Sequence, residues 1–241
     1  MTIPKRLHYC WFGKGPMPKI SRICMNSWEK KLPEYELIRW DEDRFDVNSN
    51  LYVRQAYQAK KYAFVADYVR LYALFHFGGV YVDTDVEVLK PLDSLLSHKA
   101  FSGFEDAAFV PTGIMAAKKG NGWIKELLDY YSDKVFIKPD GSFNTLTNTK
   151  IITENCLRHG LIQNGQYQEL RNGVVFYPRT YFSPYDYKNG DSYLGEESYT
   201  IHHFSQTWLP WHLRYKRILK IKCMQLLGKQ RVERLIGFVK T

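Results

Sequence analysis

The stretch that most constrains how this chain can fold covers residues 62–91. Residues 62–77 contain no glycine or proline and repeat apolar side chains at helical spacing, which predicts a helix with one buried face. A Gly-Gly pair at 78–79 ends the helix, because glycine takes the left-handed conformation without a steric penalty. The β-branched and aromatic side chains of residues 80–82 are typical of a strand. The stretch therefore predicts a helix, a turn and a buried strand in succession.

Two aspartates, Asp83 and Asp85, follow that strand. If the strand continues, the two carboxylates share one face, because side chains alternate along a strand. Paired anionic oxygen ligands suit Mg²⁺ or Mn²⁺ that carries a phosphorylated substrate. A bare D-x-D tripeptide also occurs in solvated turns, but the helix, the glycine pair and the apolar strand before it favour a metal site.

Asp67 and Arg70 lie three residues apart on the predicted helix and are therefore neighbours on its surface. One interpretation is an exposed ion pair worth about 0.3–0.5 kcal/mol. The other is a sugar-binding pair, in which the Arg70 guanidinium contacts a phosphate or a sugar hydroxyl and Asp67 accepts a hydrogen bond from the sugar. The spacing alone is compatible with both.

The ordered pattern A-D-x-x-R-x-x-x-L-x-x-x-G-G-x-Y-x-D-x-D over residues 66–85 resembles the sugar-binding DXD segment of glycosyltransferase family 32. That family includes capsular-polysaccharide glycosyltransferases and yeast outer-chain mannosyltransferases. More distantly, the pattern is similar to the glucosylating domain of large clostridial toxins. The resemblance implies an α/β fold of the GT-A type, with a mixed central sheet flanked by helices, and transfer with retention of anomeric configuration.

Two further segments extend the resemblance. The chain opens with I-P-K-x-L-H-x-x-W-F-G, and in the resembling family this tryptophan, here Trp11, lies against the nucleotide base. From the residues alone, Trp11 is equally compatible with a core position. Near the other end, H-H-x-x-x-T-W over residues 202–208 resembles a segment that closes over the nucleotide-sugar. This implies that Trp208 covers the donor.

The two histidines of that late segment leave an alternative open. On a strand they point to opposite faces, and without the resemblance one core and one surface histidine would be expected. The resemblance favours His203, with His202 as the alternative, as the protein ligand that completes the metal site with Asp83 and Asp85.

The resemblance also implies a division of roles. Asp85 binds the divalent ion and Asp83 does so through water; Arg70 and Asp67 orient the sugar, and Tyr81 packs under the donor. The chain departs from the toxin pattern at residues 111–113, where P-T-G lacks an asparagine, so that donor contact is either made by Thr112 or lost. Only by location are Glu105 and Asp106 candidate nucleophiles, and we favour a front-face route in which the leaving phosphate takes the acceptor proton.

Composition sets the class of protein. A chain of 241 residues with 45% hydrophobic residues fits one domain with a sizeable core. No stretch approaches eighteen apolar residues, and the first residues contain no long apolar run. Four widely spaced cysteines without a C-x-x-C pair indicate buried thiols in a reducing compartment rather than disulfides or zinc ligands. We therefore expect a cytoplasmic protein.

The basic charge is concentrated in one segment. Residues 212–241 contain nine basic side chains and one acidic one, which accounts for all but about one unit of the net charge of +9. A nearly neutral body argues against nucleic-acid binding. The apolar residues Val232, Leu235, Ile236 and Val239 form one helical face, which predicts a helix lying on an anionic membrane surface, at the inner face. The alternative is a helix that packs on the domain and exposes its lysines.

The remaining elements follow from local patterns. Residues 1–211 are predicted to form the catalytic domain and residues 212–241 a basic amphipathic tail. The loop over 179–197 is rich in Tyr, Gly and Asp and is typical of a binding loop or lid. Helices are expected over 20–31, 48–60 and 122–131 and after a cap at Thr147 or Asn148, and strands over 3–11, 35–40, 86–89, 99–104, 110–117, 174–177 and 199–204.

Three functions compete on these grounds. The first is a metal-dependent, retaining hexosyltransferase that uses a nucleotide-diphosphate sugar, such as a UDP-sugar, and a glycan acceptor in capsular or other surface polysaccharide synthesis. Its acceptor could be lipid-linked, which would fit the membrane-binding tail. The second is a non-catalytic protein that binds a polyanion or a membrane through the basic tail. The third, a nucleotidyltransferase, is disfavoured because the N-terminal segment lacks a Gly-rich phosphate loop with basic residues.

Overall fold

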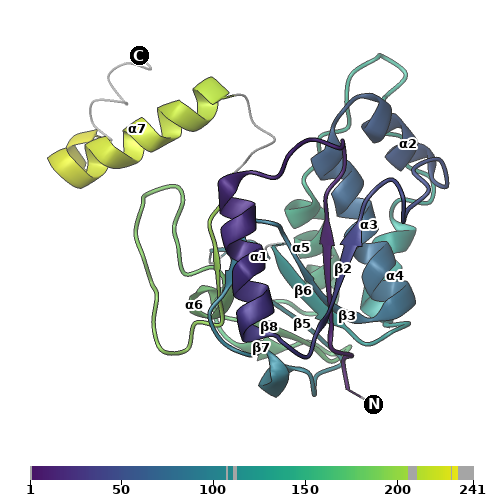
Figure 1. Cartoon of the computed structure of the whole chain (residues 1–241), viewed down its shortest axis with the longest axis horizontal. Helices are drawn as coiled ribbons and strands as arrows, with labels where there is room; N and C mark the ends of the chain where they lie inside the picture. Colours follow the sequence, from purple (N-terminus) through teal and green to yellow (C-terminus); the bar gives the residue numbers. More distant parts are fainter. Residues whose placement is uncertain (1, 107, 111–112, 206–210, 229, 233–241) are drawn as a thin grey trace.

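A computed structural model describes residues 2–106, 108–110, 113–205, 211–228 and 230–232. A seven-stranded sheet with the order β2-β1-β3-β6-β5-β8-β7 runs through the molecule (Figure 1). It is mixed: β1 pairs in parallel with both β2 and β3, whereas β6 is antiparallel to β3 and to β5. Its strands are β1 (Arg6–Cys10), β2 (Glu36–Trp40), β3 (Gly79–Val82), β5 (Ala100–Gly103), β6 (Ile114–Ala117), β7 (Gln168–Glu169) and β8 (Val174–Tyr177).

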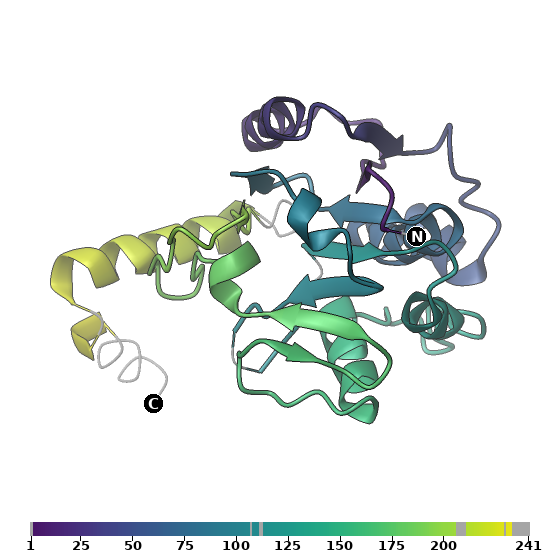
Figure 2. The same ribbon diagram turned by 90° about the horizontal axis from the view of Figure 1, so that it is seen from below.

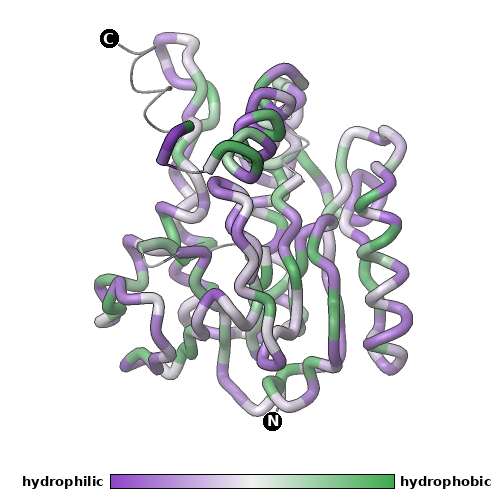
Figure 3. The backbone as a smooth tube through the Cα atoms, turned by 90° about the vertical axis from the view of Figure 1, so that its left-hand side faces the viewer, coloured by the Kyte–Doolittle hydropathy of each residue, from purple (hydrophilic) through white to green (hydrophobic). Residues whose placement is uncertain are grey.

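Helices cover both faces of this sheet (Figure 2). Buried residues of α2 to α5 form one hydrophobic cluster with the sheet, and buried residues of α1 form a second cluster on the other face. Hydrophilic and hydrophobic residues alternate along the helices, as expected when one side of a helix packs on a sheet (Figure 3). The helices are α1 (Lys19–Lys31), α2 (Leu51–Gln58), α3 (Tyr62–Phe77), α4 (Gly122–Asp129), α5 (Asn148–Arg158), α6 (Arg179–Phe182) and α7 (Trp211–Leu227), with a 3-10 turn at Asp93–Leu95.

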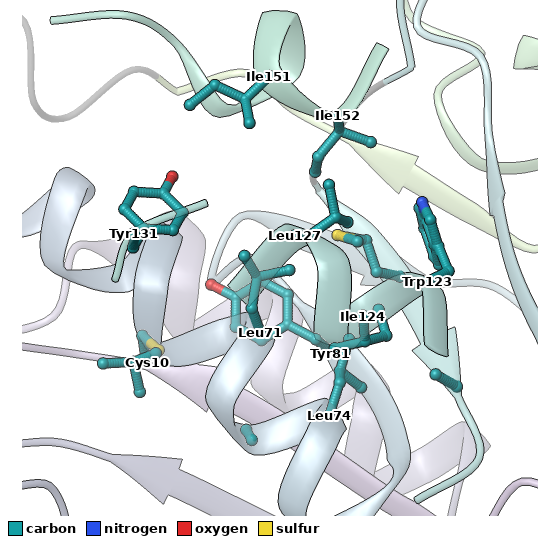
Figure 4. Close-up of a cluster of buried hydrophobic side chains, with 14 of the residues drawn as sticks. Cys10, Leu71, Leu74, Tyr81, Trp123, Ile124, Leu127, Tyr131, Ile151 and Ile152 are labelled. Atoms are coloured by element: carbon teal, nitrogen blue, oxygen red, sulfur yellow. The ribbon is translucent and has the colours of Figure 1, made fainter. Parts of the chain in front are cut away.

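Helix α3 lies in the middle of the larger cluster. Figure 4 shows Leu71 and Leu74 of α3 close to Tyr81 of β3 and to the α4 residues Ile124 and Leu127. These side chains are almost completely buried, so α3 is held between the sheet and α4. The position of the polar residues on α3 is therefore fixed by packing along most of its length.

The boundaries predicted for this helix are confirmed. It ends at Gly78, with a φ of 65°, and Gly79 follows with a φ of 123°. Both glycines are also needed for space: a Cβ on Gly78 would lie 2.6 Å from the backbone nitrogen of Lys119, and one on Gly79 would lie 2.7 Å from the carbonyl oxygen of Arg6. The pair therefore makes the sharp turn that sends β3 into the sheet beside β1.

The aspartates after β3 are not on a continuing strand, so that expectation is wrong. β3 ends at Val82, and the backbone N–H of Val86 donates to the carbonyl oxygen of Asp83 over 3.0 Å, which closes a turn. The chain turns because β4 (Val86–Val88) leaves the main sheet and pairs with β9 (Thr200–His202) in a separate antiparallel ribbon. The two carboxylates thus lie in a turn between two sheets.

The other predicted helices and strands are present; β8 has the predicted bounds, and the ends of the others differ from the predicted ones by at most four residues. The segment 179–197 is not entirely a loop, since it begins with the short helix α6, and the two-residue strand β7 was not predicted. Elements of two to four residues give little local signal, because their conformation depends on the elements they pack against.

The C-terminal segment contains the predicted basic helix. α7 includes five basic and no acidic residues, and no helix in the described part of the chain is long and apolar enough to cross a membrane. Of the apolar face predicted for the tail, only Val232 is described, and it is buried; the other three residues lie outside the described residues. The division into 1–211 and 212–241 stays a prediction.

Candidate active site

Asp83 is supported from the core side of the molecule. Its Oδ1 accepts a hydrogen bond from the hydroxyl of Tyr81 over 2.9 Å and lies 3.4 Å from Nη1 of Arg70. The hydroxyl and the guanidinium come from buried residues of β3 and α3, so both are held rigidly. Asp83 itself is partly exposed, which leaves its carboxylate accessible to a ligand.

Arg70 and Asp67 do not form an exposed surface pair. The Arg70 side chain is 5% exposed, and its Nη2 lies 3.0 Å from Oδ1 of Asp67. Its guanidinium carbon lies 4.6 Å from the ring centre of Tyr81, at cation–π distance. Burial raises the pKa of Asp67 to about 6, although the charge of Arg70 opposes the rise. A buried arginine between two aspartates holds both carboxylates in fixed positions.

Tyr81 occupies a different place from the one expected. Its ring is 1% exposed and lies against Arg70, in the interior. In this structure the ring therefore supports Arg70 and Asp83 from below and has no exposed surface on which a donor could pack. Burial raises the pKa of its phenol well above the ordinary value, so the hydroxyl stays protonated and acts as a hydrogen-bond donor to Asp83.

Asp85 is supported from the other side, by the C-terminal segment. Its Oδ2 accepts hydrogen bonds from the backbone N–H and the hydroxyl of Ser205, over 2.8 and 2.7 Å. Its Oδ1 lies 3.3 Å from Nε2 of His202. Burial alone would raise the pKa of Asp85, but the charge of His202 and the hydrogen bonds from His202 and Ser205 outweigh it and hold the pKa well below its usual value. Asp85 is thus a carboxylate at neutral pH.

The structure corrects the choice between the two histidines. His202 faces Asp85, whereas Nε2 of His203 lies 2.9 Å from Oε2 of Glu87. Because β9 pairs with β4 and Val86 lies opposite His202, the ring of His202 reaches the aspartate turn, and the next side chain along the extended segment points away. Gly113 leaves room for this ring, since a Cβ there would lie 2.6 Å from Nδ1 of His202.

Asp83, Asp85 and His202 form a group that could hold a metal ion. Among the described residues, one ligand atom from each lies within 4.8 Å of the other two. Two carboxylates and an imidazole suit Mn²⁺, and the carboxylates suit Mg²⁺ as well. In addition, Nδ1 of His202 is buried and has no hydrogen-bond partner among the described residues. The donor set and this unsatisfied nitrogen fit a divalent ion.

The remaining predicted residues differ in how well the structure places them. Trp11 follows β1 at the same sheet edge as Asp83, is half-buried, and donates its indole N–H to the carbonyl of Gly15 over 2.8 Å. Trp208 and Thr112 lie outside the described residues. Asp106 is engaged with Lys188 over 2.9 Å and with two backbone N–H groups.

Sequence reasoning missed Ser205 and Tyr187. Ser205 lies within the H-H-x-x-x-T-W segment, but a serine has no spacing signal that links it to an aspartate 120 residues away. Tyr187, from the loop after α6, packs on Phe204 with ring centres 4.4 Å apart and hydrogen-bonds to Glu105. Burial raises the pKa of Glu105, although the charge of His202 opposes the rise. Glu105 thus lies close enough to His202 for the two charges to interact.

Comparisons with known proteins agree with this geometry. Residues 18–102 match the family described as glycosyltransferase sugar-binding region containing DXD motif. Two proteins of Schizosaccharomyces pombe are similar to the chain: inositol phosphoceramide mannosyltransferase 1 is 28% identical over 110 residues, and inositol phosphoceramide mannosyltransferase 3 is 25% identical over 131 residues. These matches cover 41% and 53% of the chain and only 33% and 36% of the two relatives.

A solved structure shows the fold. A glycosyltransferase involved in the glycosylation of the major capsid of PBCV-1 superposes with a TM-score of 0.51 over 91% of this chain and all of that one, at 9% identity. At such low identity the likeness concerns the fold alone, which is of the GT-A type, as expected from the sequence. Residues 18–102 of this chain are therefore similar to a glycosyltransferase sugar-binding region that contains a DXD motif, and the chain has a GT-A type of fold.

Proposed function

We propose that this chain is a divalent-metal-dependent hexosyltransferase that takes a hexosyl unit from a nucleotide-diphosphate sugar and transfers it to a glycan acceptor. The observation that carries the proposal is the convergence of Asp83, Asp85 and His202 at the edge of the sheet, with ligand atoms within 4.8 Å. In a GT-A fold this edge is where the parallel strands β1 and β3 end, and ligands of α/β sheets bind at such edges.

Each residue around this edge has a definite part. Asp83, Asp85 and His202 would hold a divalent ion, which would supply positive charge to neutralise the diphosphate. Asp67 and Arg70 orient the sugar, and Tyr81 fixes Arg70 and Asp83 from below. Trp11 lies at the end of β1, where its ring would cover the base, and Trp208 would close over the donor. Covering the donor excludes water and limits its hydrolysis.

We further propose that the anomeric configuration is retained by a front-face route. The leaving phosphate then takes the proton of the acceptor hydroxyl, and no covalent glycosyl-enzyme forms. Glu105 is the alternative nucleophile, because its carboxylate interacts with the charge of His202. Mass spectrometry of the enzyme with donor alone distinguishes the routes: a hexosyl adduct on Glu105 would exclude the front-face route.

For the donor we favour a UDP-sugar, and for the pathway the synthesis of capsular or other surface polysaccharide, as the resemblance to capsular glycosyltransferases suggests. The names of the two yeast relatives point to mannose and to a lipid acceptor, which would fit a lipid-linked glycan acceptor here. A donor panel therefore has to include both UDP-sugars and GDP-mannose.

The experiment that tests the proposed function measures donor hydrolysis and binding. UDP-glucose, UDP-galactose, UDP-N-acetylglucosamine and GDP-mannose are each assayed with Mn²⁺ and with EDTA, for the wild type, Asp85→Ala and a matched control, Asp129→Ala, which removes an exposed carboxylate from α4. We expect Mn²⁺-dependent turnover of one donor, lost by at least about 100-fold in Asp85→Ala and unchanged in Asp129→Ala. Absence of binding to every donor would refute the proposal.

We also propose that the protein is cytoplasmic and binds an anionic membrane surface at its inner face through α7. Ile221 and Met224 face the body of the protein, whereas the apolar side chains of Tyr215, Ile218, Leu219 and Leu226 are 46–83% exposed. Basic residues alternate with them along the helix. Apolar contact combined with basic charge is typical of helices that lie on anionic lipid, at roughly 1 kcal/mol per basic residue.

Vesicle sedimentation tests the membrane proposal and separates it from the polyanion-binding alternative. We expect binding to vesicles with about 30 mol% phosphatidylserine at about 0.15 M salt, little binding to pure phosphatidylcholine, and a loss of about tenfold in Leu219→Asp. Equal binding of the two vesicle types would refute the lipid preference. If vesicle binding persisted in Asp85→Ala while no donor bound even the wild type, a non-catalytic binding protein would be the better description.

A further inference from the structure

The segment of residues 202–205 holds Asp85 through several contacts. His202 and Ser205 contact the carboxylate, and the backbone N–H of His203 donates to the backbone carbonyl of Asp85 over 3.0 Å. The ring of Phe204 stacks on His202, with ring centres 3.9 Å apart and an interplanar angle of 25°. The geometry of the acidic group thus depends on how this segment is held.

The backbone of the segment has an unusual conformation. Phe204 has a φ of 47°, in the left-handed region that side chains with a Cβ seldom adopt. Such a conformation persists only when the surrounding structure holds it in place. Phe204 is strained, and the residues on either side of it contact Asp85. Contacts from outside the segment therefore have to hold it in place.

Arg217 of α7 supplies contacts of this kind. Its Nη2 donates to the carbonyl oxygen of Phe204 over 2.9 Å, and its guanidinium carbon lies 5.7 Å from the ring centre of Tyr187. The ring of Tyr187 in turn packs on Phe204 at 4.4 Å. A continuous path of contacts therefore runs from α7 through Phe204 and His202 to Asp85.

We infer that Arg217 is a positioning residue for the group formed by Asp83, Asp85 and His202, and that α7 is consequently part of the active site's support. The inference rests on the proposed function for its metal readout, but the contacts themselves do not. The guanidinium suits this role because it can donate to a carbonyl and lie over an aromatic ring at the same time. One side of α7 would then contact lipid, and the other would support the group formed by Asp83, Asp85 and His202.

The sign of the metal effect distinguishes positioning from simple charge. Removal of a positive charge near a cation site reduces electrostatic repulsion and should strengthen metal binding. Loss of a group that orients a metal ligand weakens metal binding, typically by about 10- to 100-fold. The two explanations therefore predict changes of opposite direction for the same variant.

The experiment measures Mn²⁺ affinity of the full chain by electron paramagnetic resonance of free Mn²⁺, in the wild type, Arg217→Ala, Arg217→Lys and Lys222→Ala. Lys222 is the matched control, because it is an exposed basic residue of the same helix. We expect about a tenfold loss in Arg217→Ala, a smaller loss in Arg217→Lys, and no loss in Lys222→Ala. Tyr187→Leu, which removes the ring between Arg217 and Phe204, should resemble Arg217→Ala and serves as the test if Arg217→Ala does not fold.

A second readout is independent of the metal. The side-chain NMR resonances of ¹⁵N-labelled His202, assigned with His202→Gln, should shift in Arg217→Ala and stay in place in Lys222→Ala. If the wild type bound no Mn²⁺, the proposed function would be refuted. The His202 resonances would still test whether Arg217 positions the segment of residues 202–205. Unchanged resonances and unchanged or tighter Mn²⁺ binding in Arg217→Ala would overturn the inference, as would equal losses in Arg217→Ala and Lys222→Ala.

Discussion

Asp83 and Asp85 are two residues apart in the chain, yet different parts of the molecule support them. Asp83 is held by Tyr81 and Arg70, which belong to the buried strand and helix immediately before it. Asp85 is held by His202 and Ser205, which come from the other end of the chain. The core fixes one carboxylate, and a strained segment tied to a peripheral helix fixes the other.

The difference separates rigid from adjustable support. Around Asp83 the donors are almost completely buried in the cluster of α3, α4 and the sheet, so they can move little. Around Asp85 the donors lie on a two-stranded ribbon and a short connecting segment. The ribbon has only three residues in each strand, and the segment after it contains Phe204 with a strained φ of 47°. We therefore expect changes on the Asp83 side to affect folding and changes on the Asp85 side to affect mainly metal binding.

The largest effect is expected on the Asp83 side, for Arg70→Leu. This variant leaves Asp67 and Asp83 without their shared cation in a buried setting, which should cost about 3–5 kcal/mol of unfolding free energy. Urea denaturation followed by circular dichroism measures it. The control, Arg54→Leu on the exposed side of α2, should change stability by less than about 0.5 kcal/mol. Similar values for the two variants would show that the Asp83 side is not rigidly supported.

The second effect concerns stability in acid and the buried His8 of β1, which lies beside Tyr81 of β3 in the sheet. His8 is buried, and both of its ring nitrogens form hydrogen bonds. The indole N–H of Trp40 donates to Nδ1, and Nε2 donates to the carbonyl oxygen of Gly78. Burial lowers the pKa of His8 to about 4. The unfolded state therefore binds a proton at His8 from about pH 6.5 downward, whereas the folded state binds it only near pH 4. The free energy of unfolding consequently decreases as pH falls from about 6.5 toward 4.

This pKa shift corresponds to about 3 kcal/mol of unfolding free energy between about pH 7 and pH 4. Urea midpoints at the two pH values measure it, and His8→Gln should show a flatter pH dependence than the wild type. The same slope in both proteins would mean that His8 does not contribute, and that the acid sensitivity lies elsewhere.

The third effect tests the Asp85 side and the corrected histidine. His202→Gln should weaken Mn²⁺ binding by about 10- to 100-fold, because the glutamine amide is a poorer ligand and a poorer partner for Asp85. His203→Gln, whose ring contacts Glu87, should change it by less than about threefold. Isothermal titration calorimetry decides between them, and a larger loss in His203→Gln would favour His203, the ligand expected from the sequence.

The smallest effect compares one hydroxyl on each side. Tyr81→Phe removes the hydroxyl that donates to Asp83. Ser205→Ala removes the hydroxyl that donates to Asp85, but the backbone N–H of residue 205 still donates to that carboxylate. A single hydrogen bond contributes about 1 kcal/mol, so Tyr81→Phe should weaken Mn²⁺ binding several-fold and Ser205→Ala less. Titration of both variants against the wild type would sharpen the comparison, and a reversed order would indicate that the hydroxyl of Ser205 is the more important donor.

Much of the fold could be predicted because its signals are local. The helix of residues 62–77 has an apolar repeat and a glycine pair at its end, and its boundaries were predicted correctly. The strands and most helices likewise follow from patterns a few residues long. The spacing of Asp67 and Arg70 was enough to predict that they are neighbours, since a helix places residues three apart on one side.

The sequence determined which residues are present and which elements carry them, including the acidic pair and the basic helix. Only the tertiary structure decided that Arg70 is buried between two aspartates, that Tyr81 lies beneath them, and that His202 rather than His203 faces Asp85. The physical reason is the range of the interactions. A ribbon formed by strands more than a hundred residues apart sets which imidazole faces the site, and no local spacing encodes that pairing.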